Sequence, residues 1–386
     1  MKPVNKEGET IGGGRPHLLI LTAGFGEGHN AAARGLAAAC DELHGEGSAE
    51  VLDLFLLTSP RTSALVRSGY IGLINRLPRL WRGIYGLMDR SALLPRLLSS
   101  SLRPQVRFLA RRFEAGCPRA ICSTYPVYPF LLERLREQGR LPVPHYTVVT
   151  DSISIHSLWW RSPCDGWFVP NADSAAVMEG RGVNPQRLNV SGFPVTPYFR
   201  RHAGEFTRPD LGSGATPRVL HIINSGTRHA AATAERLLSG SEFEVTCAVG
   251  RNEKLRKRLE RVAAGRSKPS RILGWTDEIP RLLMTHHVVV SKAGGATTQE
   301  AIAAECPMIV SQVVPGQEEG NCELVLRHGA GNLAESTEAV IAALRQAFAQ
   351  RGALWRRWHA AMAPLSRPDA ARVIVRTVLQ AGEAAP

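Results

Sequence analysis

The residues between 288 and 331 combine side-chain types and spacings that could bind a nucleotide. The run VVVS at 288–291 is short, apolar and β-branched, two glycines follow it, and residues 296–305 have the composition of a helix. Unpaired amides and the positive end of the helix dipole favour an anion at such a helix start, so a diphosphate could bind there without a metal. The residues predicted to bind a nucleotide-linked donor substrate through their backbone are Gly294, Gly295, Ala296 and Thr297.

Polar side chains that suit sugar hydroxyls follow this glycine turn. Glu300 lies one helical turn further on, where a carboxylate could accept both hydroxyls of a ribose. The loop PGQEEGN at 315–321 offers amide and carboxylate groups at Gln317, Glu318, Glu319 and Asn321. An ordinary buried strand–helix–strand unit with a solvated loop would contain the same glycines, because Gly-rich turns are weak signals by themselves. The glycines alone therefore do not distinguish a nucleotide site from this alternative.

A second glycine loop, at 24–28, precedes a histidine that could act as a base. Gly26 and Gly28 place His29 at or near the first turn of a helix, where the positive dipole end disfavours an imidazolium ion. A neutral imidazole can take the proton of an acceptor hydroxyl as that hydroxyl attacks an anomeric carbon. A lone histidine can equally be a structural residue, so the hypothesis depends on a nucleotide-sugar site opposite the loop.

Two further polar residues follow the predicted strand HYTVVT at 145–150. Asp151 ends this strand and either orients His29 or is a second candidate base. His156, five residues later, is a candidate for holding phosphate or acceptor, together with Gly26 and Gly28. Asp151 and His156 could instead be ordinary polar loop residues.

Motifs spread along the chain fall in one order. They are LLILTAGFGEGHNAAARGLAAAC at 18–40, VVTDSISIHSLWW at 148–160, SGFPV at 191–195, GGATTQEA at 294–301 and PGQEEGN at 315–321. This order resembles the family of monogalactosyldiacylglycerol synthases and processive diacylglycerol glucosyltransferases, glycosyltransferase family 28. The peptidoglycan N-acetylglucosaminyltransferase is a more distant relative of that family. The resemblance spans residues 15–365, and its first and last motifs are the most specific.

The resemblance implies a UDP-hexose donor, carrying glucose or galactose, and diacylglycerol or a related membrane lipid as acceptor. It also implies inversion at the anomeric carbon and the two-domain GT-B architecture. The family has a glycine-rich loop after the first strand of its second half, and the corresponding residues 219–231 contain a single glycine, Gly226. We expect Gly226 and Arg228 to belong to the donor site.

Neither a metal nor another cofactor is predicted. The nine aspartates include no pair two residues apart, so the chain has no DxD motif to hold a divalent ion on a diphosphate. The negative charge of the leaving group must then be stabilised by the N-terminus of the helix that begins near Gly295. Backbone amides and Arg228 or Lys292 could contribute to this stabilisation.

The alternation of apolar runs and helix-like segments predicts an α/β protein. Two doubly wound, Rossmann-like domains should face a cleft, with the carboxyl ends of their parallel strands at the cleft. We expect a disordered leader at 1–15, an acceptor and membrane domain at 16–200, a linker at 201–217, a UDP-sugar domain at 218–365, and a helix at 366–386 that packs back across the hinge. Seven cysteines without CxxC spacing suit a reduced cytoplasmic setting.

Charge is concentrated in one part of the chain. The total net charge is +13, and residues 61–112 contain eleven arginines against one acid, Asp89, which gives that segment +10. Arginines that alternate with bulky apolar and aromatic residues are typical of a surface lying on an anionic bilayer. Nucleic acid and a solvated helical face are the competing interpretations. The predicted membrane residues are Arg76, Arg79, Trp81, Arg82 and Tyr85.

The sequence therefore predicts a hexosyltransferase that is peripheral on the inner face of the cell membrane. No run of 18 apolar residues is present, so no membrane span is expected. A transferase acting on a lipid-linked peptidoglycan precursor is the alternative enzyme. A catalytically silent protein that binds nucleotide sugar or anionic lipid is the alternative of another class, because a fold alone does not fix an activity. The hexose, processivity and oligomeric state stay open.

Overall fold

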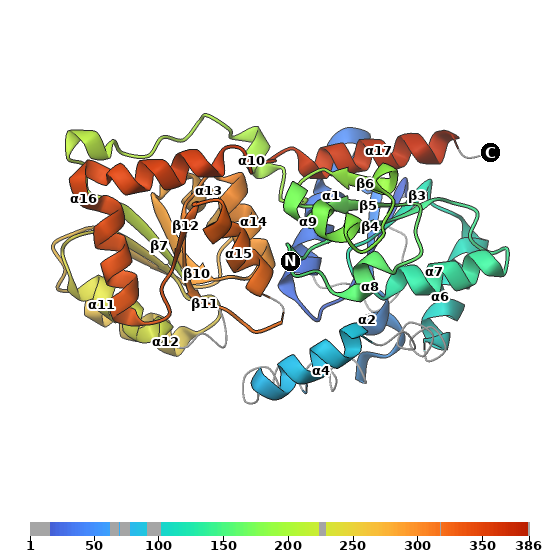
Figure 1. Cartoon of the computed structure of the whole chain (residues 1–386), viewed down its shortest axis with the longest axis horizontal. Helices are drawn as coiled ribbons and strands as arrows, with labels where there is room; N and C mark the ends of the chain where they lie inside the picture. Colours follow the sequence, from blue (N-terminus) through green and yellow to red (C-terminus); the bar gives the residue numbers. More distant parts are fainter. Residues whose placement is uncertain are drawn as a thin grey trace.

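The computed structural model describes residues 16–61, 69, 78–90, 102–223, 229–316 and 318–384. In this part of the chain, two six-stranded sheets lie side by side, each with all its strand pairs parallel (Figure 1). The predicted architecture of two doubly wound α/β domains is confirmed.

The first sheet has the order β2-β1-β3-β4-β5-β6. Its strands are β1 (Leu18–Thr22), β2 (Ala49–Asp53), β3 (Ala120–Ser123), β4 (His145–Val148), β5 (Gly166–Val169) and β6 (Leu188–Val190). The helices around it are α1 (Glu27–His44), α2 (Leu54–Thr58), α4 (Pro78–Arg90), α6 (Arg103–Ala115), α7 (Tyr128–Glu137), α8 (Ser157–Trp160) and α9 (Ala172–Glu179), with a short 3₁₀ turn at Pro185–Arg187. After β6, helix α10 (Tyr198–Arg201) and a 3₁₀ turn at Leu211–Ser213 contact helices of the second domain.

The continuous apolar run of β1 is explained by burial on both faces of the sheet. Leu18 and Ile20 lie in one core cluster with residues of α1 and of the last helix, α17 (Ala370–Ala384). Leu19 and Leu21 point the other way and pack with residues of α6 and α7. A strand covered on both faces needs apolar residues at every position rather than at alternate ones.

The second sheet has the order β12-β11-β10-β7-β8-β9. Its strands are β7 (Arg218–Ile222), β8 (Glu244–Ala248), β9 (Ser270–Leu273), β10 (Val288–Lys292), β11 (Met308–Gln312) and β12 (Gly331–Leu333). Its helices are α11 (Ala230–Ser239), α12 (Glu253–Ala263), α13 (Ile279–Thr285), α14 (Gly295–Ala303), α15 (Glu319–Arg327) and α16 (Thr337–Met362).

The end of the chain crosses from the second domain to the first. Helix α16 is kinked at residues 349–352 and contributes Leu344 and Trp358 to the core of the second domain. After it, α17 buries Ile374 and Val378 against the first sheet, and Figure 1 shows it lying along that domain. No helix of the described residues is long and apolar enough to cross a membrane.

The two domains touch through the segment that follows β4. A Cβ atom at Gly320, in α15, would collide with the Ser152 carbonyl, so only glycine allows this approach. Gln299 of α14 donates a hydrogen bond to Ser152 Oγ at 3.0 Å. Ile153 has φ 55°, a conformation costly for a β-branched residue, and its side chain lies in a core cluster made mainly by the second domain. Tight packing therefore holds residues 150–154 against the starts of α14 and α15.

Candidate active site

His29 is the third residue of α1, which begins directly after the glycine loop of β1. Its Nδ1 lies 2.9 Å from Oγ1 of Thr150, which stands two residues after β4, and its backbone carbonyl accepts a hydrogen bond from Thr124 Oγ1 at 3.1 Å. Burial lowers the pKa of the imidazole to about 4, against a smaller opposing contribution from a backbone hydrogen bond to Thr124. The ring is therefore neutral near pH 7 and can accept a proton.

An aromatic wall, formed by Phe25, Phe55, Tyr125 and Trp159, borders this histidine. The Tyr125 ring meets the imidazole edge-on at 5.2 Å between centroids, and the Trp159 ring lies 5.9 Å from it. Phe25 stacks on Tyr125 at 5.9 Å, and Phe55 contacts both rings. These apolar groups explain why burial dominates the pKa of His29, since they exclude the water that would stabilise its charged form.

Asp151 lies next to Thr150 but is not the hydrogen-bond partner of His29 Nδ1. Its Oδ2 accepts a hydrogen bond from the indole N–H of Trp159 at 2.7 Å, and burial raises the pKa of the carboxyl to about 6. Thr150, which the sequence interpretation did not single out, takes the place beside Nδ1. The orienting role first considered for Asp151 is thus filled by its neighbour, and the second option, a base, stays a prediction.

His156 is buried at the start of α8. Its Nδ1 accepts the backbone N–H of Leu158 at 3.2 Å, so the imidazole caps the helix, and burial lowers its pKa. This hydrogen bond gives His156 a structural task in the described chain. Its predicted contact with phosphate or acceptor stays a prediction.

The predicted phosphate turn stands at the start of α14. Gly294 is the N-cap residue and makes no side-chain cap, and the first turn, with Ala296 and Thr297, contains no acid. Asn321 donates from Nδ2 to the Ala293 carbonyl at 3.0 Å and so fixes the turn from α15. The Asn321 Oδ1 atom is buried and has no hydrogen-bond partner among the described residues. The turn thus combines uncapped amides with an amide oxygen able to accept a further donor.

Two charged residues of the predicted donor site already pair with each other. Lys292 Nζ forms an ion pair with Glu318 Oε1, and Glu318 Oε2 accepts the Val314 N–H at 3.1 Å. Glu318 is buried, with 7% of its surface exposed. The positive charge of Lys292 is therefore largely met by Glu318, which leaves the amides of α14 as the stronger candidates for a diphosphate.

Glu300 lies on α14 where that helix faces α1. Burial raises the pKa of its carboxyl to about 7, with Arg34 of α1 lowering it and Glu27 of α1 raising it. A Cβ atom on Gly28 would lie 3.9 Å from the Ala296 nitrogen. The two glycine-led helix starts, one carrying His29 and the other carrying uncapped amides, therefore meet across the domain interface.

Known proteins resemble this chain along most of its length. Residues 29–195 match the family model of monogalactosyldiacylglycerol (MGDG) synthase. Processive diacylglycerol beta-glucosyltransferases of Bacillus thuringiensis (strain Al Hakam) and Bacillus cereus (strain AH820) are each 24% identical over 379 residues, covering 96% of this chain and 95% of the relative. The chain is similar to these enzymes along most of its length. The resemblance predicted from the glycine motifs is confirmed, and so is the predicted class of enzyme, a glycosyltransferase.

Solved structures share the fold at low sequence identity. A UDP-glucosyltransferase from Polygonum tinctorium superposes with a TM-score of 0.60 at 13% identity, covering 96% of this chain and 100% of that one. UDP-GlcNAc 2-epimerase from Neisseria meningitidis, bound to UDP-GlcNAc, gives a TM-score of 0.58 at 13% identity, covering 94% and 99%. The GT-B architecture expected for this chain is therefore confirmed.

Several predicted residues fall outside the description. Gly226, Arg228, Gln317 and Arg76 lie outside the described residues. The backbones of Arg79, Trp81, Arg82 and Tyr85 belong to α4, but their side chains are not described.

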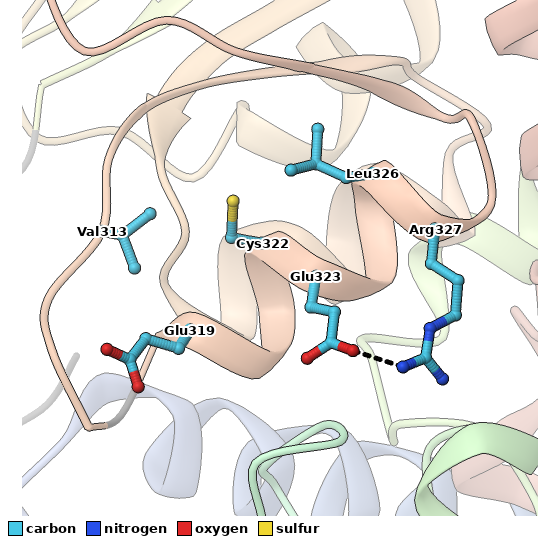
Figure 2. Close-up of a pocket in the computed structure, with 6 residues that line it drawn as sticks. All are labelled: Val313, Glu319, Cys322, Glu323, Leu326 and Arg327. Atoms are coloured by element: carbon cyan, nitrogen blue, oxygen red, sulfur yellow. Dashed lines mark hydrogen bonds and ion pairs between the residues drawn. The ribbon is translucent and has the colours of Figure 1, made fainter.

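A surface hollow of about 570 Å³ runs along α15. Figure 2 shows Cys322, Leu326 and Val313 around its apolar part, and Glu323 paired with Arg327. Among its lining residues, Glu319 alone comes from the loop at 315–321 that was predicted to bind sugar hydroxyls. The two glycine turns, where His29 and the uncapped amides lie, stay the candidate active site.

Sequence reasoning missed Thr150, the aromatic wall and Trp275. Trp275 lies two residues after β9, with 64% of its surface exposed. Their positions in the sequence could have indicated them. Each follows a strand at the carboxyl edge of a sheet or lies on a helix beside that edge, and α/β enzymes bind their ligands at this edge. Trp275 stands at the same edge of the second sheet as the glycine turn, since the strands are parallel.

Proposed function

We propose that this chain is an inverting, metal-independent hexosyltransferase that moves glucose or galactose from a UDP-sugar to the hydroxyl of diacylglycerol or a related membrane lipid. The observation that carries the proposal is the meeting of the two helix starts. His29, held neutral in an aromatic surrounding, stands on α1, while the uncapped amides stand on α14. Gly28 and Ala296 are the residues at which these two turns approach each other.

The donor is proposed to bind along the carboxyl edge of the second sheet. The diphosphate takes the amides at the start of α14, because the first turn of that helix carries no competing acid. The Glu300 carboxylate accepts the ribose hydroxyls, and Asn321 Oδ1 accepts a hydroxyl of the donor. Trp275 offers an exposed aromatic face on which the base can stack.

The transfer itself is a direct displacement assisted by His29. With Nδ1–H donating to Thr150 Oγ1, the Nε2 lone pair takes the proton of the acceptor hydroxyl. The hydroxyl oxygen bonds to the anomeric carbon as the bond from that carbon to the UDP oxygen breaks, and UDP leaves with the electron pair. Attack on the face opposite UDP inverts the configuration. The α14 amides stabilise the charge that develops on the diphosphate.

The acceptor is proposed to come from a membrane surface that α4 contacts. Leu80, Ile84 and Leu87 follow the i, i+4, i+7 spacing of one helix face, and all three are exposed. The surrounding segment, residues 61–112, carries a net charge of +10. An exposed apolar stripe among arginines suits an anionic bilayer, on the cytoplasmic side where UDP-sugars are available. Sedimentation with anionic vesicles that weakens as salt rises would test this contact.

The decisive experiment incubates the protein with detergent-solubilised diacylglycerol and, separately, UDP-glucose, UDP-galactose and UDP-N-acetylglucosamine. We expect UDP release and a glycolipid of the matching mass with one of the hexose donors. His29→Ala is the control for catalysis by this site. UDP release without glycolipid, or turnover only with a lipid-linked peptidoglycan precursor, would contradict the proposed acceptor, and UDP-sugar binding without turnover on either lipid would contradict an enzyme.

A further inference from the structure

Asp89 stands in the last turn of α4, where an acid does not suit its own helix. The carbonyl end of a helix carries partial negative charge, so an aspartate there is unfavourable by itself. It is also the one acid in the basic segment 61–112. Its Oδ1 accepts the backbone N–H of Ser157 at 2.5 Å, and its backbone carbonyl accepts Ser157 Oγ–H at 2.7 Å. Asp89 therefore caps the N-terminus of another helix, α8, and places its carboxylate at the positive end of that helix.

Helix α8 needs such support because it is a single turn. Four residues cannot form a stable helix alone, and the first amides of a helix have no partner within it. Asp89 satisfies the amide of Ser157, and His156 satisfies that of Leu158 at 3.2 Å. Two side chains, one from α4 and one from the preceding loop, thus fix where α8 begins.

The third residue of α8 holds a group of the candidate active site. Trp159 is buried, donates its indole N–H to Asp151 Oδ2 at 2.7 Å, and has its ring 5.9 Å from that of His29. Its backbone carbonyl accepts hydrogen bonds from Ser162 Oγ–H and from the Trp167 indole N–H, both at 2.8 Å. The position of α8 thus sets the position of both Trp159 and Asp151.

We propose that Asp89 is a positioning residue for the acceptor side of the site, which ties the start of α8 to α4 and thereby holds Trp159 and Asp151 beside His29. The inference rests on the proposed function, and it connects the helix assigned to the membrane with the edge of the sheet where transfer occurs. Because Asp89 contacts neither α14 nor α15 in the hydrogen bonds and ion pairs of the described residues, it should affect the acceptor step and leave donor binding unchanged.

The kinetic test compares Asp89→Ala, Asp89→Asn and Glu114→Ala with the wild type, using a short-chain soluble diacylglycerol. Glu114 is a matched control because it is an exposed acid on α6, paired only with Arg140 among its described ion pairs. Asp89→Ala should lower kcat about tenfold while the KM for UDP-sugar stays within about twofold. Asp89→Asn keeps an oxygen that accepts the Ser157 N–H, so it should stay within about threefold of the wild type.

A spectroscopic readout tests the tether without catalysis. The indole N–H of Trp159 can be followed by ¹⁵N-labelled tryptophan NMR and assigned with Trp159→Phe. Its hydrogen exchange should quicken in Asp89→Ala and stay unchanged in Asp89→Asn and Glu114→Ala. If the wild type transfers no sugar, the proposed function fails while this exchange experiment still tests the tether.

Three outcomes would overturn the positioning role. One is unchanged exchange at Trp159 in Asp89→Ala. Another is an equal loss of kcat in Asp89→Ala and Asp89→Asn, since the second keeps the hydrogen bond. The third is a loss of kcat that appears only together with a general fall in melting temperature, because that would mark Asp89 as a purely structural residue.

Discussion

The chain contains the same strand–glycine–helix unit twice, once in each domain. Gly26 is the N-cap residue of α1 and Gly294 is the N-cap residue of α14, and neither supplies a side-chain hydrogen bond to the first amides of its helix. Their first turns differ. Helix α1 carries an acid, Glu27, two residues before His29, whereas the first turn of α14 carries none. Glycine allows a close approach to the backbone in both places, and we propose that the first-turn side chains decide which ligand each place suits.

The difference assigns opposite chemistry to the two turns. A carboxylate in the first turn of α1 offsets the positive dipole end, so that turn suits a neutral hydroxyl rather than a phosphate. The bare first turn of α14 suits an anion. Burial then keeps His29 uncharged, with its pKa lowered to about 4, and raises the pKa of Glu300 on α14 to about 7. If the two turns act separately, a change in one of them should leave the function of the other unaltered.

Removing the base should produce the largest effect. His29→Ala should lower kcat by 10²–10⁴-fold, as expected for a lost general base. The Kd for UDP-sugar should stay within a few fold, because His29 belongs to the glycine turn before α1, where the acceptor is proposed to bind (the acceptor turn). Single-turnover transfer and calorimetric titration measure the two quantities on the same sample. Retained turnover would remove His29 from the mechanism, and a parallel loss of UDP-sugar binding would show that the two turns are not chemically separate.

Glu300 should make donor binding depend on pH. With a pKa of about 7, its carboxyl is mostly ionised above pH 7 and protonated below it, and only the ionised form can accept two ribose hydroxyls. The Kd of UDP-glucose should therefore rise about tenfold between pH 8 and pH 6, as the competent fraction falls. Glu300→Gln should bind more weakly at pH 8, by roughly 10- to 100-fold, and show little pH dependence.

UDP-glucose is the suitable ligand for this titration, because its diphosphate, unlike that of UDP, has no second ionisation near neutral pH. Arg34 and Glu27 of α1 are the charged neighbours of Glu300. A Kd that stays flat with pH in the wild type would show that the Glu300 carboxyl does not contact the donor.

Local pattern was enough to predict the two sheets and both glycine turns, but not the partners within the site. The apolar runs and the glycines are features of neighbouring residues, so they can be read along the chain. Thr150 reaches His29 across 121 positions, and Glu300 faces α1 from another domain. Such pairings follow from strand order and domain packing. They explain why Asp151 was considered for the place that its neighbour Thr150 fills.

Thr150 should have a moderate effect confined to the acceptor turn. Thr150→Val keeps the shape and removes the Oγ1 atom that lies 2.9 Å from His29 Nδ1, so neither ring nitrogen is favoured for the proton. We expect kcat to fall about tenfold with UDP-sugar affinity unchanged, and Thr150→Ser to restore most of it. The ¹⁵N shifts of His29 should report a changed tautomer in the valine variant. A serine variant as slow as valine would show that the methyl group, rather than the hydroxyl, is what the site requires.

Removing divalent ions should have the smallest effect, and it tests the α14 turn directly. The diphosphate is proposed to be held by amides at a helix start without an acid, and the sequence has no DxD motif that would hold a metal there. Excess chelator should therefore leave kcat and the KM for UDP-sugar within about twofold. A loss of activity that magnesium restores would contradict this. It would also show that α14 prefers an anion because of a bound cation. The absence of an acid from its first turn would then not explain the difference between the two turns.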